Sequence, residues 1–161
     1  MRGEGGFTLL EIVVVVAIIA TLLAIATLDF SRMQKKGTTE KEVRQMYSDV
    51  ENARLQAVYG KKPTAVVFQP GSYTFKQYSS ENEDPSAGTT VSSQSLTSQL
   101  TLADGSSIAG QSAQFDPRGA AGAVMNILAN PAGSDAAVDC IVIDIARTSM
   151  GKMQNGTCVI K

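Results

Sequence analysis

The feature that most constrains this chain is a long apolar run near its amino terminus. The run extends from Phe7 to Leu28, and its only polar side chains are Thr8, Glu11, Thr21 and Thr27. An α-helix of 22 residues, at about 1.5 Å per residue, spans roughly 33 Å, which is enough to cross the hydrocarbon core of a bilayer. The sequence therefore predicts a membrane-spanning helix over residues 7–28.

A short polar segment, residues 1–6, precedes this helix. A secretory signal peptide carries a small-residue cleavage site after its apolar core. No Ala-x-Ala-like site follows the apolar run here. We therefore expect the apolar helix to remain in the mature protein as an anchor.

The anchor contains one carboxylate, Glu11, about one helical turn from its start. An acid at the centre of a membrane span costs about 2.5 to 3.5 kcal/mol, and less near the membrane edge. The simplest interpretation is an acid that reaches the lipid headgroups or is protonated. The other is an acid that awaits a partner of opposite charge.

The residues around Glu11 favour the second interpretation. The string Gly6-Phe7-Thr8-Leu9-Leu10-Glu11, followed by the apolar residues 12–20, resembles the class III leader and helix start of type IV prepilins and type II secretion pseudopilins. The resemblance implies that a prepilin peptidase cuts between Gly6 and Phe7 and methylates the new amino group of Phe7. It also implies that Glu11 pairs with the Phe7 amino group of a neighbouring subunit during assembly. Such an ion pair is strongest where water is excluded.

The same resemblance implies a location and a set of partners. The amino terminus would be cytoplasmic and the rest periplasmic, in a single-pass inner-membrane precursor that later joins a periplasmic pseudopilus or a cell-surface pilus. Its partners would be other pilin or pseudopilin subunits, the prepilin peptidase, the inner-membrane assembly platform and, before assembly, membrane lipid. The positive-inside rule alone favours the opposite orientation, because basic residues follow the span: Arg32, Lys35, Lys36 and Lys41.

Residues 29–60 are predicted to continue the helix and to pack against a head. Apolar residues recur at steps of three and four, namely Val43, Met46, Tyr47, Val50, Ala53, Ala57 and Val58. Gly37 predicts a weak joint, and Gly60 with Pro63 predicts the helix end. Family helices often carry a proline near Leu28, which this chain lacks, so a kink there is left open.

Residues 61–161 are predicted to form an antiparallel β-sheet head, which gives an α+β, pilin-like fold. Strands are expected where apolar residues alternate or cluster, at 65–68, 73–76, 100–102, 114–115, 125–128 and 138–146. Residues 79–99 are almost wholly polar, and they predict a long exposed loop without a strand. Phe115-Asp116-Pro117-Arg118-Gly119 and the strand at 141–143 resemble the heads of the H-type minor pseudopilin and related minor pilins.

The two cysteines, Cys140 and Cys158, predict one disulfide outside the cytoplasm, worth about 3 kcal/mol. The alternative is two buried free thiols. If the cysteines face each other across adjacent antiparallel strands, the turn lies at residues 149–151. A turn at Asn155-Gly156 would instead put Cys158 opposite Met153. We favour the turn at 149–151.

Composition limits the functions that compete with a filament subunit. The chain has no His and only two Cys, which excludes His-based catalysis, a His-ligated metal and a four-cysteine zinc site. No nucleophile elbow or phosphate loop is present, so we predict no enzyme, no metal and no cofactor. Some minor pilins capture DNA, and this alternative needs clustered cations. The net charge is −1, so the candidates are local ones: Arg118, Arg147, Lys152 and Lys161.

Overall fold

The computed structural model describes residues 7–80, 83, 87–130 and 135–161, with the backbone alone at 25–28 and 130. The predicted leader, residues 1–6, lies outside these ranges. The chain divides into two compact units, Met1–Lys35 and Lys36–Lys161. A single helix, α1 (Leu9–Gly60), contributes residues to both units.

The first unit is the apolar part of α1. Its 18-residue window of highest hydropathy averages 2.9 and is 0% buried, so by length and composition this helix can cross a membrane. The helix is continuous through residues 25–29, where the sequence leaves a kink open, and through Gly37, where the sequence predicts a weak joint.

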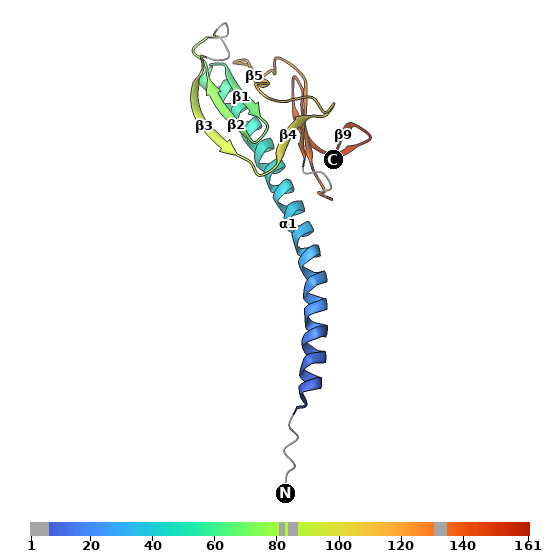
Figure 1. Ribbon diagram of the computed structural model, residues 1–161. Helices are drawn as coiled ribbons and strands as arrows, with labels where there is room; N and C mark the ends of the chain where they lie inside the picture. Colours follow the sequence, from blue (N-terminus) through green and yellow to red (C-terminus); the bar gives the residue numbers. More distant parts are fainter. Residues whose placement is uncertain (1–6, 81–82, 84–86, 131–134) are drawn as a thin grey trace. The chain divides into compact units, whose positions relative to one another are not determined.

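The second unit is the head, which combines the end of α1 with two antiparallel sheets in the described part of the chain (Figure 1). One sheet has the order β3-β2-β1-β5 and the other the order β4-β6-β7-β8-β9. The strands are β1 (Thr64–Gln69), β2 (Ser72–Gln77), β3 (Thr89–Ser95), β4 (Gln99–Leu102), β5 (Ser112–Phe115), β6 (Met125–Asn130), β7 (Cys140–Ile143), β8 (Thr148–Gln154) and β9 (Thr157–Ile160). The α+β prediction is confirmed, with two sheets rather than one.

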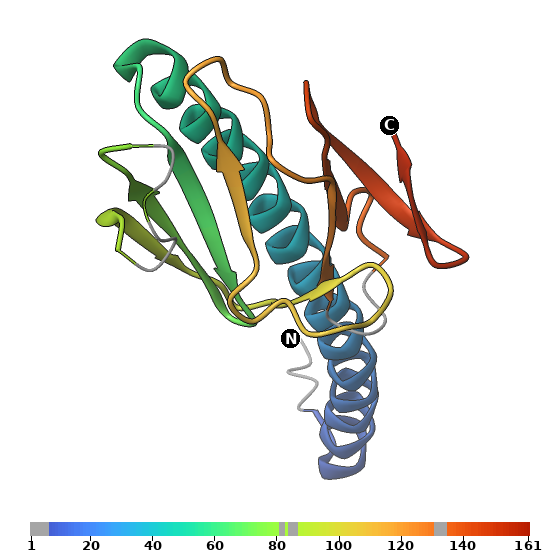
Figure 2. The ribbon, with the colours of Figure 1, turned by 90° about the horizontal axis from the view of Figure 1, so that it is seen from above.

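One hydrophobic core joins α1 to both sheets. The two sheets lie on different sides of the helix when the head is viewed from above (Figure 2). The core takes its helix side chains from the predicted stripe, at Val43, Met46, Val50, Ala53 and Ala57. Both sheets add large buried side chains, among them Phe68, Tyr73, Phe115, Ile127, Ile141 and Ile143. The three-and-four spacing of the stripe is therefore what positions the head on α1.

A buried arginine, Arg54, lies within this stripe and is 8% exposed. One of its terminal nitrogens, Nη1, donates to the carbonyl oxygens of Gly119 (2.7 Å) and Ile145 (3.0 Å). The other, Nη2, donates to the Asp144 carbonyl oxygen at 3.1 Å. Its guanidinium carbon lies 4.9 Å from the centroid of the Phe115 ring. Arg54 thus links the helix to the loop after β5 and to the β7–β8 turn.

The prediction of a strandless loop over 79–99 is wrong, because β3 occupies Thr89–Ser95 within it. All seven residues of β3 are exposed, so the strand shows no apolar alternation from which it could be predicted. Its order comes from backbone pairing with β2, in a register from Ser72↔Ser95 to Gln77↔Thr89. These backbone hydrogen bonds hold β3 at the edge of its sheet although neither of its faces is covered.

The favoured turn at residues 149–151 is also wrong. These residues lie inside β8, and the hairpin turn is at Asn155 and Gly156, which have φ angles of 49° and 79°. Positive φ at both positions is what a two-residue hairpin turn of type I′ requires, and Asn-Gly supplies it. Cys158 consequently pairs with Met153, as the less favoured alternative required.

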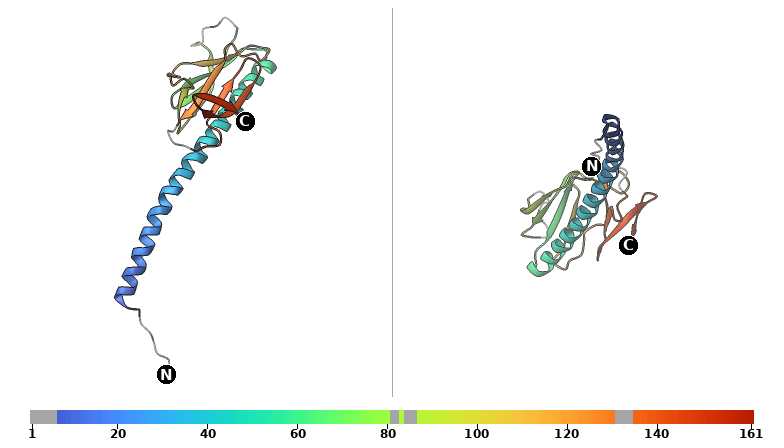
Figure 3. Two further views of the ribbon diagram at one scale, coloured as in Figure 1. Left: turned by 90° about the vertical axis from the view of Figure 1, so that its right-hand side faces the viewer. Right: turned by 90° about the horizontal axis from the view of Figure 1, so that it is seen from below.

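The predicted disulfide between Cys140 and Cys158 is present, but it joins strands that are not neighbours. Cys140 pairs with Gly151 across β7 and β8, and Gly151 pairs with Ile160 across β8 and β9. The bond therefore passes over β8 at Gly151. The two Cα atoms are 6.0 Å apart, less than two strand spacings of about 4.8 Å each, so the sheet bends sharply at its β9 edge. This edge carries the carboxyl terminus (Figure 3).

Candidate processing and assembly site

The amino-terminal segment of α1 holds the predicted processing and assembly residues. Phe7 and Thr8 precede the helix, whose first residue is Leu9. The Thr8 hydroxyl oxygen accepts a hydrogen bond from the Glu11 backbone N–H at 3.2 Å. The Thr8 carbonyl oxygen accepts from the N–H groups of Glu11 (3.1 Å) and Ile12 (3.3 Å). Thr8 is therefore the N-cap of α1.

Glu11 lies in the first turn of the helix, where the unpaired backbone N–H groups favour a negative charge. Phe7 and Glu11 border the same hollow of about 200 Å³, whose other lining residues are apolar: Ile12, Val15 and Val16. Glu11 has no ion-pair partner among the residues that the structure describes. A cation brought to this hollow by another molecule would meet the carboxylate in apolar surroundings.

The surface around Glu11 is apolar on every side of the helix. Phe7 is 80% exposed and Leu9 83% exposed, and the large side chains that follow are also exposed: Leu10, Ile12, Val13, Val14, Val15, Val16, Ile18, Ile19, Leu22 and Leu23. Contiguous apolar surface of this extent is covered by lipid or by other protein chains in a functioning molecule. The helix is thus suited to a membrane and to a helix-packed assembly.

Comparison with known families decides what kind of segment this is. Residues 1–27 match the prokaryotic N-terminal methylation motif. The motif includes Gly6, which lies outside the described residues, and also Phe7 and Glu11. No curated protein and no solved structure matches the chain.

The methylation motif is a structural, pilin-type motif. The match suggests a type IV pilin-like substrate of prepilin peptidase that is made as a membrane-anchored precursor. The match ends at residue 27, so the head lies outside it. What the head does must be argued from its own residues.

The four cations proposed for DNA binding are not gathered into one patch of free charges. The Arg118 Nε donates to the Asp116 carboxylate at 3.0 Å, and the Lys152 Nζ lies 3.4 Å from the Asp139 carboxylate. Arg118 belongs to the loop after β5, whereas Lys152 is on β8. The other two candidates are exposed, one in the β7–β8 turn and one after β9: Arg147 and Lys161.

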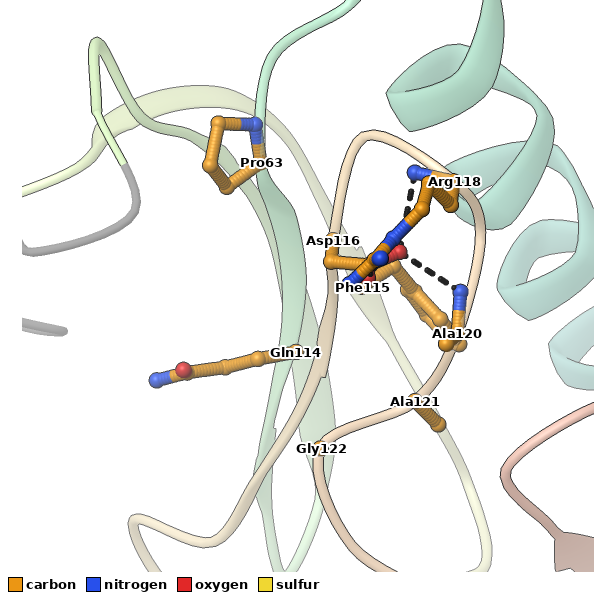
Figure 4. A pocket seen from close by; sticks show the side chains of 8 residues that line it. All are labelled: Pro63, Gln114, Phe115, Asp116, Arg118, Ala120, Ala121 and Gly122. Carbon is orange, nitrogen blue, oxygen red and sulfur yellow. Dashed lines mark hydrogen bonds and ion pairs between the residues drawn. The ribbon is translucent and has the colours of Figure 1, made fainter.

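The Phe115–Gly119 loop borders a cavity of about 300 Å³ that also contacts Pro63 and Gln114 (Figure 4). The Asp116 carboxylate accepts hydrogen bonds from the N–H groups of Arg118 (2.9 Å) and Ala120 (2.8 Å). Burial opposes ionisation of Asp116, but these hydrogen bonds and the Arg118 side chain lower its pKa below the usual range. The Asp116 carboxylate therefore holds this loop in shape, and both of its oxygen atoms already accept hydrogen bonds from the loop.

Two residues with structural roles are not identified in the sequence analysis, the cap of α1 and the arginine that links α1 to the loops of the head. Thr8 stands three residues before Glu11, which is the Thr-x-x-Glu spacing of a capping box, so the cap was predictable. Arg54 stands between Ala53 and Ala57 in the apolar stripe. Small neighbours leave space for a long side chain, but nothing in the sequence identifies the carbonyl groups that Arg54 reaches.

Proposed function

We propose that this chain is a subunit of a type IV pilus-like or type II secretion filament. Prepilin peptidase cuts it between Gly6 and Phe7 and methylates the Phe7 amino group, and the mature subunit assembles through α1. The observation that carries the proposal is the carboxylate of Glu11, in the first turn of a helix whose surroundings are apolar and uncovered, within a matched methylation motif.

Assembly follows from the cost of leaving Glu11 alone in that environment. An unpaired carboxylate in a medium of low dielectric is unfavourable, and a cation within a few ångströms relieves much of the cost. The Phe7 amino group of a neighbouring subunit supplies this cation at the end of an equally apolar helix. The pair therefore favours the polymer over the isolated subunit and fixes the axial register of neighbouring helices.

We propose further that the head is of the minor pseudopilin type, most similar to the H-type and related minor pilins. Support comes from the Phe115–Gly119 loop, which Arg54 ties to α1, and from the buried strand at residues 141–143. The precursor would sit in the inner membrane with its amino terminus in the cytoplasm and its head in the periplasm. Its head would stay periplasmic in a pseudopilus or reach the surface in a pilus.

The DNA-binding alternative has less support, because two of its four cations already contact carboxylates. Its test is a double variant, Arg147→Ala with Lys152→Ala. Under the DNA-binding alternative, the variant filaments retain less DNA at low salt than the parent. Unchanged retention would remove this alternative.

The test of the filament proposal is Glu11→Ala in the full chain, produced together with the peptidase and the assembly machinery. We expect a processed, membrane-inserted monomer and no filaments, because the apolar anchor is intact and the assembly charge is lost. Asp29→Ala is the matched control, since it removes an exposed acid from the same helix beyond the predicted span. Normal filaments from Glu11→Ala would contradict the proposal.

A further inference from the structure

We propose that the heads of neighbouring subunits join by strand pairing, in which the free edge of β3 in one copy of the chain pairs with the free edge of β9 in the next copy. This inference rests on the proposed function, because assembly through α1 is what brings the copies together. It adds a contact between heads to the contact between helices, and this chain supplies both sides of that contact.

The outer edges of the two sheets differ in how they are covered. In the described part of the chain, the outer strands are β3 and β5 in one sheet and β4 and β9 in the other. Loops of the head cover β5 and β4. The Gly122 N–H donates to the Gln114 carbonyl oxygen on β5 at 2.9 Å, and the Leu100 N–H on β4 donates to the Pro70 carbonyl oxygen at 2.5 Å. Among the described residues, no such backbone hydrogen bond reaches the outer edge of β3 or of β9.

β3 directs the backbone groups of Ser93 and Ser95 away from its sheet. Along an edge strand, alternate residues pair with the neighbouring strand and the residues between them do not. The N–H of Leu96, the residue that follows β3, donates to the Gly71 carbonyl oxygen beside β2 at 2.8 Å. The register with β2 is regular here, because the bulge of β3 lies nearer its start. Counting back from Leu96, Gln94 faces β2, and the two serines face outward.

β9 presents a matching set of backbone groups, at Cys158 and Ile160. The Lys161 N–H donates to the Met150 carbonyl oxygen on β8 at 3.1 Å, so Lys161 faces β8. Counting back from Lys161, Ile160 and Cys158 face outward. Each free edge therefore offers the N–H and carbonyl groups of two residues that stand two positions apart. Pairing the two edges gives the outward groups of both strands a partner.

Neither free edge carries the side chains that keep exposed strands from pairing. Edge strands are commonly protected by charged side chains, above all lysine, or by proline. β3 and β9 contain no charged residue and no proline. All seven residues of β3 are exposed, and Val159 and Ile160 on β9 are 44% and 48% exposed. Both edges are thus open to another strand.

The positions of the two edges fit a chain of subunits. β3 and β9 lie on opposite sides of the head, with α1 between them (Figure 1, Figure 2). A contact between two different surfaces of the same molecule is heterologous, and its repetition builds an open filament where the rotation does not close a ring. In the proposed filament, α1 holds a second copy nearby. The occupant of the β3 edge is therefore the β9 edge of the next subunit.

The direct test is photo-crosslinking in filaments of the full chain, made with the peptidase and the assembly machinery. The substitution is Gln94→benzoylphenylalanine, at an exposed residue of β3, which leaves the outward N–H groups of Ser93 and Ser95 in place. After irradiation and reduction, trypsin cuts behind Lys152 and releases peptide 153–161, which contains β9. We expect a crosslink to this peptide in filaments and none in subunits dispersed in detergent.

The matched control is Gln114→benzoylphenylalanine, at an exposed residue of the covered strand β5, which should not crosslink to peptide 153–161. Filaments in which position 94 crosslinks only to β3 of another copy, only to other peptides or to nothing would overturn the proposal. Failure of the proposed function is recognised separately, by normal filaments from Glu11→Ala. Filaments that depend on Glu11 but lack the crosslink contradict the head contact alone.

A backbone variant separates strand pairing from side-chain contact. Ser93→Pro removes one outward N–H, and edge strands tolerate proline where the N–H faces away from the sheet. Ser93→Ala removes the same hydroxyl and keeps the N–H. We expect Ser93→Pro to lower the fraction of processed subunit in sheared filaments about fivefold relative to Ser93→Ala, the effect of one lost hydrogen bond. Urea unfolding in detergent should give the two variants equal midpoints.

Equal assembled fractions for Ser93→Pro and Ser93→Ala would overturn strand pairing at β3. If proline at position 93 lowers the unfolding midpoint, the same comparison is made on the other edge, with Ile160→Pro against Ile160→Ala. The proposal expects the same deficit there, because the Ile160 N–H also faces outward. Assembly of Ile160→Pro at the level of Ile160→Ala would contradict it.

Discussion

At the scale of single residues, Arg54 decides how the head is held on its helix. It donates to carbonyl oxygens at Gly119, Asp144 and Ile145, and its Nε lies 3.4 Å from the Glu51 carboxylate. Removing it leaves several buried acceptors and one acid without their partner. We expect Arg54→Met to lower the free energy of unfolding by about 3 kcal/mol.

The measurement for Arg54 is urea unfolding of the full chain in detergent micelles, followed by near-ultraviolet circular dichroism. Arg44→Met is the control, because Arg44 is an exposed arginine on the same helix. Arg54→Lys should recover only part of the loss, since an ammonium group cannot reproduce the forked contacts of a guanidinium. Equal unfolding midpoints for Arg54→Met and Arg44→Met would contradict this role.

Glu42 gives the head a dependence on pH. Burial alone would raise its pKa, but hydrogen bonds from Ser98 and Thr97 outweigh it and hold the pKa below its ordinary value of 4.5. The two backbone N–H groups lie 3.0 Å and 2.6 Å from the Glu42 carboxylate. A lowered folded-state pKa means that this stabilisation is complete above about pH 4.5 and is lost as the pH falls through the folded pKa.

The corresponding prediction concerns Glu42→Gln, which cannot titrate. At pH 7 the variant should have a lower free energy of unfolding than the parent. The difference between the two free energies should become smaller as the pH is lowered below 4.5. Unfolding free energies of both proteins at a series of pH values check this. If the difference in unfolding free energy stays constant across the pH series, the ionised carboxylate does not contribute to the stability of the head.

At the scale of elements, the β8–β9 hairpin depends on the absence of a side chain at Gly151. A Cβ atom there would lie 2.8 Å from the Val159 carbonyl carbon and 2.9 Å from the Cys158 Sγ. We expect Gly151→Ala to push β9 away, to cost about 1 to 3 kcal/mol of overpacking and to leave a measurable fraction of free thiol. Mass spectrometry after alkylation without reduction measures that fraction.

The control for Gly151 is Gly122→Ala, whose new Cβ would meet nothing closer than the Gln114 carbonyl oxygen at 3.9 Å. This variant should form the disulfide fully. Complete disulfide formation and unchanged stability in Gly151→Ala would mean that β9 reaches Cys140 by a different path.

At the scale of the whole molecule, the sequence predicts best those elements whose residue pattern follows directly from burial in a membrane or in a core. An apolar run long enough for a bilayer predicted the first part of α1, and a three-and-four stripe predicted the helix face that the head covers. The sequence was least informative where order comes from backbone pairing or from distant contacts. The exposed strand β3 has no buried face to leave a pattern, and Arg54 contacts carbonyl groups that any sequence could supply.

The hairpin turn failed for a different reason. Asn155-Gly156 is a strong turn signal, but a turn there is incompatible with two cysteines that face each other on adjacent strands. The disulfide passes over β8 instead, which only a glycine at position 151 permits. The residues proposed for processing and assembly are recognisable because they form a contiguous motif, and the Thr8 cap belongs to that same string.

The most direct test of the central claim is intact mass and amino-terminal sequencing of the protein from sheared surface filaments and, separately, from membranes. The account predicts a processed chain that begins with N-methyl-Phe7 and is two hydrogens lighter for the Cys140–Cys158 disulfide. Recovery in the filament fraction indicates a pilus subunit, and recovery in membranes alone indicates a pseudopilin. A chain that still begins at Met1 in both fractions would contradict the account.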